Sequence, residues 1–205
     1  MQTKDHWESV YSTKPIHGVS WFQEHAAISL RLIRETGVLG SAPIIDVGGG
    51  ASTLVDDLLF HGYSALTVLD LSGMALAAAK ARLGSDATQV QWIESDITSV
   101  QLPTHAYEVW HDRAVFHFLT SRAEREAYLE AVLRSVKPGG HVIVATFAED
   151  GPTQCSGLPV MRYSEADLRA EFGASLVLIH YEKEQHPTPM GTVQNFIYCY
   201  FRKAS

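Results

Sequence analysis

Cysteine is scarce in this chain of 205 residues, and the two that occur form no motif. Cys155 and Cys199 lie far apart, and neither belongs to a CxxC pair or to a Cys/His spacing typical of zinc sites. The ten histidines contain no H-x-x-x-H pair. We therefore predict two reduced thiols and no bound metal, as expected for a cytoplasmic protein.

Positive charge and long apolar stretches are scarce as well. The chain has 16 Lys and Arg against 23 Asp and Glu, a formal net charge of -7, and no basic run. Such a surface offers no electrostatic attraction to nucleic acid or to an anionic membrane. No apolar stretch approaches the ~18 residues of a membrane span, and the first residues contain no apolar signal segment. We expect no nucleic-acid partner and no membrane partner.

Strand-like and helix-like segments alternate along most of the chain. Strands are expected at 42–48, 65–70, 89–96, from 106 to about 112, at 141–148, 175–184 and 194–203. Helices are expected at 21–36, 52–62, 73–84, 121–136 and 164–172. The alternation predicts an α/β fold with a doubly wound, seven-stranded, mainly parallel sheet. Its last strand is reversed, because no helix fits between the final two strands. We expect a single domain over 1–205, with 1–40 as an N-terminal helical cap.

Local signals mark where some of these elements begin. Ser20 with Gln23, and Ser121 with Glu124, have the spacing of a capping box at a helix start. Ser164 is expected to open the last helix. The Lys-Pro-Gly-Gly sequence at 137–140 predicts a turn before the fifth strand.

A glycine-rich loop, IIDVGGGAS at 44–52, follows the first strand and precedes a helix. Loops in this context bind nucleotide-like ligands. The dinucleotide pattern GxGxxG is fulfilled by Gly48 and Gly50 but not at its third glycine, where this chain has Thr53. The pyrophosphate site is thus incomplete. A D-x-G-x-G loop beginning at Asp46 suits a ligand without phosphates, such as S-adenosylmethionine.

Two acids stand at the ends of the next two strands. Asp70 lies about 20 residues after the loop, where a carboxylate accepts hydrogen bonds from both ribose hydroxyls. An acid there also suits the N-terminus of a helix. Asp96 is placed to receive the amino group of an adenine, or to form a turn.

Five segments in this order resemble the motifs of class I S-adenosylmethionine-dependent methyltransferases. They are IIDVGGGAS, LTVLDLS, IESDIT, VWHDRAVFHFL and LRSVKPGGHVIVATF, within about residues 40–150. Gly49 departs from the pattern, since many relatives have Cys or another residue there. The resemblance implies methyl transfer with S-adenosylmethionine as the cofactor.

The resemblance also implies roles for single residues. Asp46 orders the glycine loop and reaches the cofactor's ammonium through water, Leu71 covers the adenine, and Asp112 or His111 lies near the methionyl part. The expected cofactor-binding residues are Tyr11, Trp21, Asp46, Gly48, Gly50, Asp70, Leu71, Asp96, Ile97 and Asp112.

The N-terminal aromatics have two interpretations. Trp7, Tyr11 and Trp21 either close over the cofactor or form only a hydrophobic cluster. In the first case, Tyr11 and Lys14 would contact the cofactor's carboxylate.

Candidates for catalysis come from the loops after strands four and five. Methyl transfer needs alignment of the reacting atoms, and it needs a base only for a protonated nucleophile. We predict His117 as such a base, and Arg113 and Arg162 as contacts to a substrate anion. Alternatively, His117 is a packed residue and Arg113 a structural ion pair. Cys155 ranks below them, because no partner base can be identified.

The sequence favours a small-molecule acceptor. There is no N/D-P-P-Y/F motif after strand four and no basic face, which argues against DNA and RNA. The segments added around the common core are short, which favours a small pocket over a surface for docking a protein. Methylation of a protein side chain, of the lysine type, is the alternative. Thr53 and the KPGG turn argue against an NAD-dependent oxidoreductase, and the intact Gly48, Gly50 and Asp70 argue against a non-catalytic S-adenosylmethionine-binding protein.

Overall fold

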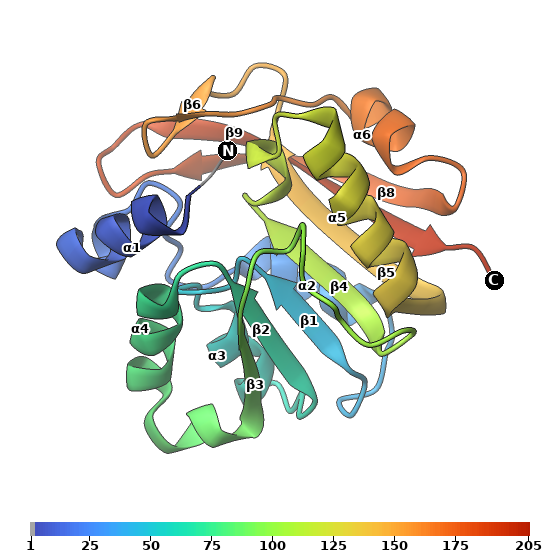
Figure 1. Cartoon of the computed structure of the whole chain (residues 1–205), viewed down its shortest axis with the longest axis horizontal. Coiled ribbons are helices and arrows are strands. Elements are labelled where there is room, and N and C mark those ends of the chain that lie inside the picture. Colours follow the sequence, from blue (N-terminus) through green and yellow to red (C-terminus); the bar gives the residue numbers. More distant parts are fainter. Residues whose placement is uncertain (1–2) are drawn as a thin grey trace.

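Seven strands form one sheet in the computed structural model, which describes residues 3–205 (Figure 1). The strands are β1 (Ile44–Val47), β2 (Leu66–Asp70), β3 (Val90–Glu94), β4 (Tyr107–Arg113), β5 (Val136–Phe147), β8 (Leu176–Pro187) and β9 (Val193–Lys203). Their order is β3-β2-β1-β4-β5-β9-β8. Strand β9 is antiparallel to β5 and to β8, and the pairs from β3 to β5 are parallel. The predicted fold class, including the reversed last strand, is confirmed.

Helices cover both faces of this sheet. They are α1 (Lys4–Thr13), α2 (Ala27–Glu35), α3 (Leu54–Phe60), α4 (Gly73–Leu83), α5 (Arg122–Ser135) and α6 (Glu165–Phe172). Three short 3₁₀ turns are η1 (Ile16–Gly18), η2 (Gly84–Gln89) and η3 (Phe116–Phe118), and β6 (Gln154–Cys155) pairs with β7 (Leu158–Pro159) in a small hairpin. In Figure 1, α5 and α6 lie in front of the sheet, and α2 and α3 lie behind it. None of the helices within residues 3–205 has the length and apolar character needed to cross a membrane.

Two hydrophobic cores result, one on each face. Neighbouring residues of a strand point to opposite faces, so Ile44 of β1 belongs to the core beneath α2 and α3, and Ile45 belongs to the core beneath α5 and α6. Both side chains are at most 1% exposed. Burial of apolar surface in each core stabilises the fold by about 25 cal/mol per Å² of surface removed from water. The sheet is thereby a rigid base for the loops at its edges.

The N-terminal region differs from the prediction. The helix expected at 21–36 begins only at Ala27, and Ser20 and Gln23 form no capping box. Their carbonyl groups have other partners: the Ser20 carbonyl accepts a hydrogen bond from His186 Nε2 at 2.9 Å, and that of Gln23 accepts one from Thr53 Oγ1 at 3.1 Å. These tertiary contacts hold residues 20–23 out of the helix. The helix α1 was not predicted.

The Lys-Pro-Gly-Gly sequence also differs from the prediction. It lies within β5, which begins at Val136, instead of forming a turn before the strand. Gly139 has φ +72°, and the pairing with β4 shifts between Tyr107 and Val109. The four residues therefore form an irregularity inside the strand.

Other local predictions are confirmed. Ser121 and Glu124 form a capping box at the start of α5. Ser164 caps α6, where Asp167 completes a second capping box. In each box the hydroxyl accepts a backbone N–H of the first turn, and the acid accepts the backbone N–H of the serine.

Candidate active site

The main cavity of the described chain opens at the carboxyl ends of β1, β2, β3 and β4. The register aligns Val47 of β1 with Leu69 of β2 and with Asp112 of β4, so their following loops lie side by side. The chain order along the sheet reverses between β1 and β4, and ligands of open α/β sheets bind at such a point. The cavity has a volume of about 870 Å³, its open mouth included, which suits a small-molecule ligand.

The glycine loop lies close against its neighbours. Gly48 lines the cavity with φ +70°, and a Cβ atom there would lie 1.9 Å from Val115 Cγ2. A Cβ atom at Gly50 would lie 2.4 Å from Asp70 Oδ2 and 2.6 Å from Ala75 Cβ. Gly48 thus meets the cavity directly. Gly50 does not line it and instead allows the carboxylate of Asp70 to approach the loop.

Asp70 joins this loop to the end of β2. Its Oδ2 atom accepts the backbone N–H of Gly50 at 3.0 Å, and its Oδ1 atom accepts that of Ser72 at 2.8 Å. Only 7% of the residue is exposed, yet it lines the cavity. Burial raises the pKa of Asp70 to about 6, in spite of the two N–H groups that favour the charged form.

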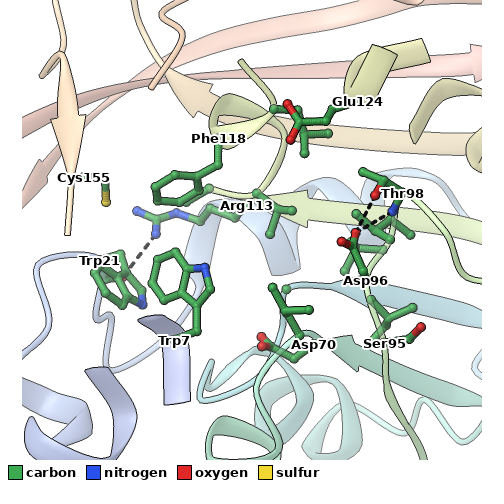
Figure 2. A pocket seen from close by; sticks show the side chains of 18 of the residues that line it. Trp7, Trp21, Asp70, Ser95, Asp96, Thr98, Arg113, Phe118, Glu124 and Cys155 are labelled. Carbon is green, nitrogen blue, oxygen red and sulfur yellow. Dashed lines mark hydrogen bonds between the residues drawn. The ribbon is translucent and has the colours of Figure 1, made fainter. Parts of the chain in front are cut away.

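The ends of β2 and β3 form one side of the cavity. Leu71, Asp96 and Ile97 line it, together with Ser95 and Thr98. Asp96 Oδ1 accepts hydrogen bonds from the backbone N–H and the hydroxyl of Thr98, at 2.8 and 2.7 Å. Figure 2 shows Asp70, Ser95 and Asp96 together at this end. The Asp96 carboxylate is therefore held by the turn that it forms with Thr98, which is the second of the two interpretations of Asp96.

Aromatic rings form the opposite side, which we name the aromatic wall: Trp7 and Tyr11 of α1, Trp21, and Phe118 of η3. The ring centroid of Trp7 lies 5.1 Å from that of Phe118 and 5.8 Å from that of Trp21. Figure 2 places Trp7, Trp21 and Phe118 around the side chain of Arg113, with Cys155 beyond them. The rings form a cluster with one another, and they also line the cavity.

Arg113 reaches the cavity from the end of β4, but three of its five N–H donors are in use. Its Nε atom donates to the Tyr198 hydroxyl at 2.8 Å, Nη1 to the Trp21 carbonyl at 3.2 Å, and Nη2 to Glu184 Oε2 at 3.3 Å. Its side chain is 9% exposed and that of Glu184 is 11% exposed. The guanidinium also lies 4.2 Å from the ring centre of Phe196. The geometry is that of a structural ion pair which fixes Trp21, and it leaves little capacity for a substrate anion.

A second cavity of about 550 Å³ adjoins the first on the other side of the glycine loop. Both are lined by Tyr11, Trp21, Gly48 and Arg113. Asp46 and His111 lie in the wall of the second cavity and are buried, with Asp46 Oδ1 and His111 Nδ1 2.7 Å apart.

Three polar atoms in the wall of this second cavity have no hydrogen-bond partner among the described residues. They are Asp46 Oδ2, His111 Nε2 and Ser29 Oγ. Buried polar atoms of this kind normally have a partner. Their surroundings are therefore suited to a polar ligand group.

Two predicted catalytic residues lie outside both cavities. His117 is fully buried, and its Nδ1 atom accepts the backbone N–H of Phe147 at 3.3 Å. Burial, with a contribution from Arg113, lowers the pKa of His117 to about 3. Arg162 is exposed and lines a separate depression beside α5 and α6. The structure thus supports the packed interpretation of His117 and brings neither residue to the candidate site.

Asp112 is also absent from the cavity walls. It is fully buried, and its carboxylate accepts the Tyr128 hydroxyl at 2.7 Å and the backbone N–H groups of Val115 and Phe116. Burial raises the pKa of Asp112 to about 7. Asp112 shapes the turn after β4, in which Ala114 has φ +69°, and thereby places η3.

Sequence reasoning missed several residues of the site. Phe118 was not singled out, although its position beside His117 in an aromatic stretch was a usable signal. Glu184, the partner of Arg113, is distant in sequence and gave none. Glu8 of α1 was also missed: its carboxylate accepts the backbone N–H groups of Gly73 and Met74, at 2.7 and 3.2 Å, and so attaches α1 to the start of α4.

Comparison with known proteins agrees with this geometry. Residues 44–140 match the family model of a methyltransferase domain. Among solved structures, a Burkholderia thailandensis 1,6-didemethyltoxoflavin-N1-methyltransferase with bound S-adenosylhomocysteine is 17% identical, with a TM-score of 0.72. The match covers 98% of this chain and 87% of that one. A structure described for the conversion of a disulfide bond into a thioacetal group during echinomycin biosynthesis is 15% identical, with a TM-score of 0.78, over 99% and 92% of the two chains. At these identities the structures show a shared fold.

One curated protein is similar in sequence. The eEF1A lysine and N-terminal methyltransferase of Mus musculus is 22% identical over 139 residues. The match covers 68% of this chain but only 20% of the mouse protein, so this chain spans a small part of that relative's length. The matched family model includes the glycine loop, Asp70 and the turn after β4, which form part of the cavity wall. The chain therefore contains a region that matches a methyltransferase domain, and it shares its fold with solved methyltransferases.

Proposed function

We propose that the chain is a class I S-adenosylmethionine-dependent methyltransferase. Its acceptor would be a small molecule, held at the aromatic wall of the main cavity. The enclosure of the cavity supports this assignment. Helix α1 and Trp21 stand on one side of it, and Phe118 and Cys155 complete the same end. An acceptor has to fit inside this space beside the cofactor, which suits a compact molecule.

The residues present fit S-adenosylmethionine. Asp70 would accept the ribose hydroxyls, Leu71 and Ile97 would contact the adenine, and Asp96 would receive its amino group. The absence of a Cβ atom at Gly48 lets the glycine loop lie directly against Val115, beside the cavity that both residues line. When bound, the cofactor supplies a methyl group activated on a sulfonium.

The second cavity would hold the amino-acid end of the cofactor. The unpartnered atoms of Asp46, His111 and Ser29 are suited to its ammonium and carboxylate groups. Tyr11 and Trp21 line both cavities, so they would lie where the two parts of the cofactor join. Lys14 is exposed and lines neither cavity, so we do not assign it to the carboxylate.

The chain's own contribution to catalysis would be alignment and exclusion of water. The bonds from Arg113 to Trp21 and from Glu8 to α4 fix the aromatic wall. Holding reactants in line in this way accounts for much of the rate of such displacements. Residues 1–205 would act as one domain, with 1–40 as the cap that carries Trp7, Tyr11 and Trp21 of the wall.

Methylation of a protein side chain is the competing assignment. The mouse relative named for lysine and N-terminal methylation supports it, although the two chains share only part of their length. A cell extract can be divided by dialysis into small molecules and proteins, and each part incubated with the enzyme and S-adenosylmethionine labelled on its methyl group. We expect label to be transferred in the dialysed small-molecule part. Transfer only in the protein part would overturn the proposal.

A further inference from the structure

The charges and rings at the acceptor end of the cavity define the chemistry of the acceptor. We propose that it is a neutral nitrogen nucleophile, an amine or a ring nitrogen, whose methylated product is a cation. This inference rests on the proposed function above, since it concerns the same site.

The aromatic wall is suited to a cation. Its rings are linked through Trp7, whose centroid lies 5.1 Å from that of Phe118, 5.8 Å from that of Trp21 and 6.3 Å from that of Tyr11. All four side chains line the cavity. The faces of such rings attract a positive charge, and they do so more strongly when water is excluded.

The charged groups of the cavity also favour a cation. Carboxylates of Asp70, Asp96 and Glu124 line it, and among the described residues that do so Arg113 is the sole basic side chain. The charge of Arg113 is compensated by Glu184, and three of its five N–H donors are occupied. An anionic acceptor would therefore enter a cavity that carries more negative than positive charge, with Asp70 and Asp96 on the side opposite the aromatic wall.

The nearby protic groups do not act as bases at neutral pH. Burial raises the pKa of the Cys155 thiol to about 12 and raises that of the Tyr11 hydroxyl above its ordinary value. His117 lies outside the cavity. A nitrogen that is uncharged at neutral pH fits this site because its lone pair is free. An aliphatic amine would first have to lose its proton to water, because it is mostly protonated at that pH.

The reaction then conserves charge within the cavity. The nitrogen lone pair forms the new N–C bond, and the C–S bond breaks with its electron pair remaining on sulfur. The positive charge passes from sulfur to nitrogen, which leaves neutral S-adenosylhomocysteine and a methylated ammonium. A tertiary or ring nitrogen gives a permanent cation, and any extra proton of a primary or secondary amine is released to water. The same rings and carboxylates stabilise the charge before and after transfer.

A matched pair of probes tests this without knowledge of the acceptor. Choline carries a quaternary ammonium, and 3,3-dimethylbutan-1-ol is its neutral carbon isostere. Each is titrated by calorimetry into the enzyme saturated with S-adenosylhomocysteine, with benzoate as an anionic probe. We expect choline to bind about tenfold more tightly than the isostere, as cation–π contacts in a desolvated site allow. Equal binding of choline and the isostere, or tighter binding of benzoate, would overturn the inference.

Substitutions assign the preference to the rings. Trp21→Leu and Phe118→Leu should each reduce the choline preference several-fold, and Trp21 is the safer site because it is only partly buried. Phe60→Leu is the matched control, because Phe60 is 87% exposed and lines neither cavity. A choline preference that survives both ring variants, shown by circular dichroism to be folded, would contradict the role of the wall.

The same experiments separate this inference from the proposed function. Failure of S-adenosylhomocysteine to bind would refute both. Binding of S-adenosylhomocysteine without a choline preference would refute only the present inference. In the transfer assay, the labelled product should be retained by a cation exchanger at neutral pH, and a labelled product that is not retained would count against a cationic product.

Discussion

Asp70 combines a structural and a binding role in one carboxylate. It accepts N–H groups from the glycine loop and from the turn after β2, and it still faces the cavity. Burial raises the pKa of Asp70 to about 6, above its ordinary value of 3.8. Between these two values the folded chain holds a proton that the unfolded chain has released. The contribution of Asp70 to folding stability therefore decreases as the pH rises through this window.

Cofactor binding should have the opposite dependence on pH. Ribose hydroxyls donate to the ionised carboxylate, so the affinity for S-adenosylhomocysteine should fall as the pH drops through about 6. Asp70→Asn should weaken binding about tenfold, because bonds to a charged acceptor contribute roughly 1.5–3 kcal/mol. It should also flatten this part of the pH profile. Calorimetry from about pH 5 to about pH 8 checks both effects, and an unchanged profile in the variant would remove Asp70 from the binding site.

Gly48 is expected to be intolerant of any side chain. Gly48→Ala places a methyl group 1.9 Å from Val115 Cγ2, and the stiff Val115 side chain has little freedom to move. Gly37 is a matched control, since it has φ +73° with no neighbouring atom within 4 Å of the added Cβ. Gly37→Ala should cost about 1 kcal/mol from the left-handed backbone alone. Gly48→Ala should cost at least about 1 kcal/mol more from overpacking. Urea denaturation measures the difference, and equal losses would show that Val115 adapts.

At the scale of elements, the central strands and their following helices could be predicted, and the N-terminal region could not. The strands are rich in branched apolar residues. The capping boxes at Ser121 and Ser164 are local signals that the structure confirms. Ser20 and Gln23 carry a similar signal, but their backbone carbonyls bond to His186 and Thr53. Long-range contacts of this kind override local propensity and leave no trace in a short window.

The candidate site divides in the same way. Positions at or just after the end of a strand, such as Gly48, Asp70 and Asp96, could be predicted because the strand's end fixes where they lie. The hydrogen-bond partners of Arg113 could not be predicted, because Glu184 and Tyr198 come from the far end of the chain. Charge compensation is a property of the assembled fold.

Helix α1 is held to the rest of the molecule by few polar contacts, and Glu8 makes the most specific of them. Glu8 accepts two N–H groups in the first turn of α4, where the helix dipole also favours an acid. Because α1 carries Trp7 and Tyr11 into the cavity wall, its attachment should affect how long a ligand stays bound. Glu8→Ala should raise the Kd of S-adenosylhomocysteine several-fold, mainly through faster dissociation, as the loss of about 1 kcal/mol predicts.

A control from the same helix makes this prediction specific. Lys4 forms an ion pair with Glu94, but both side chains are about half exposed, and such pairs contribute little. Lys4→Met should leave the dissociation rate within about twofold. Stopped-flow measurement of tryptophan fluorescence follows both variants. If they behave alike, attachment of α1 through Glu8 does not control release.

At the scale of the whole molecule, the cofactor would contact several elements at once along the edge of the sheet where the cavities lie. The proposed binding mode engages α1, the glycine loop and the ends of β2 and β3 at once. These parts are distant in sequence but surround two joined cavities. A ligand that contacts all of them binds the folded state alone, and its binding free energy adds to the free energy of unfolding.

Thermal unfolding should therefore distinguish the cofactor classes. At a hundredfold excess over its Kd, S-adenosylhomocysteine should stabilise the chain by about 2.7 kcal/mol. For a domain of this size, that corresponds to a rise in Tm of roughly 5–11 °C. NADH should give no comparable rise, because Thr53 stands where a pyrophosphate site requires its third glycine. Asp70→Asn should reduce the rise with S-adenosylhomocysteine while the unliganded Tm stays high enough for comparison. A rise with NADH and none with S-adenosylhomocysteine would contradict the assignment of the cavity to S-adenosylmethionine.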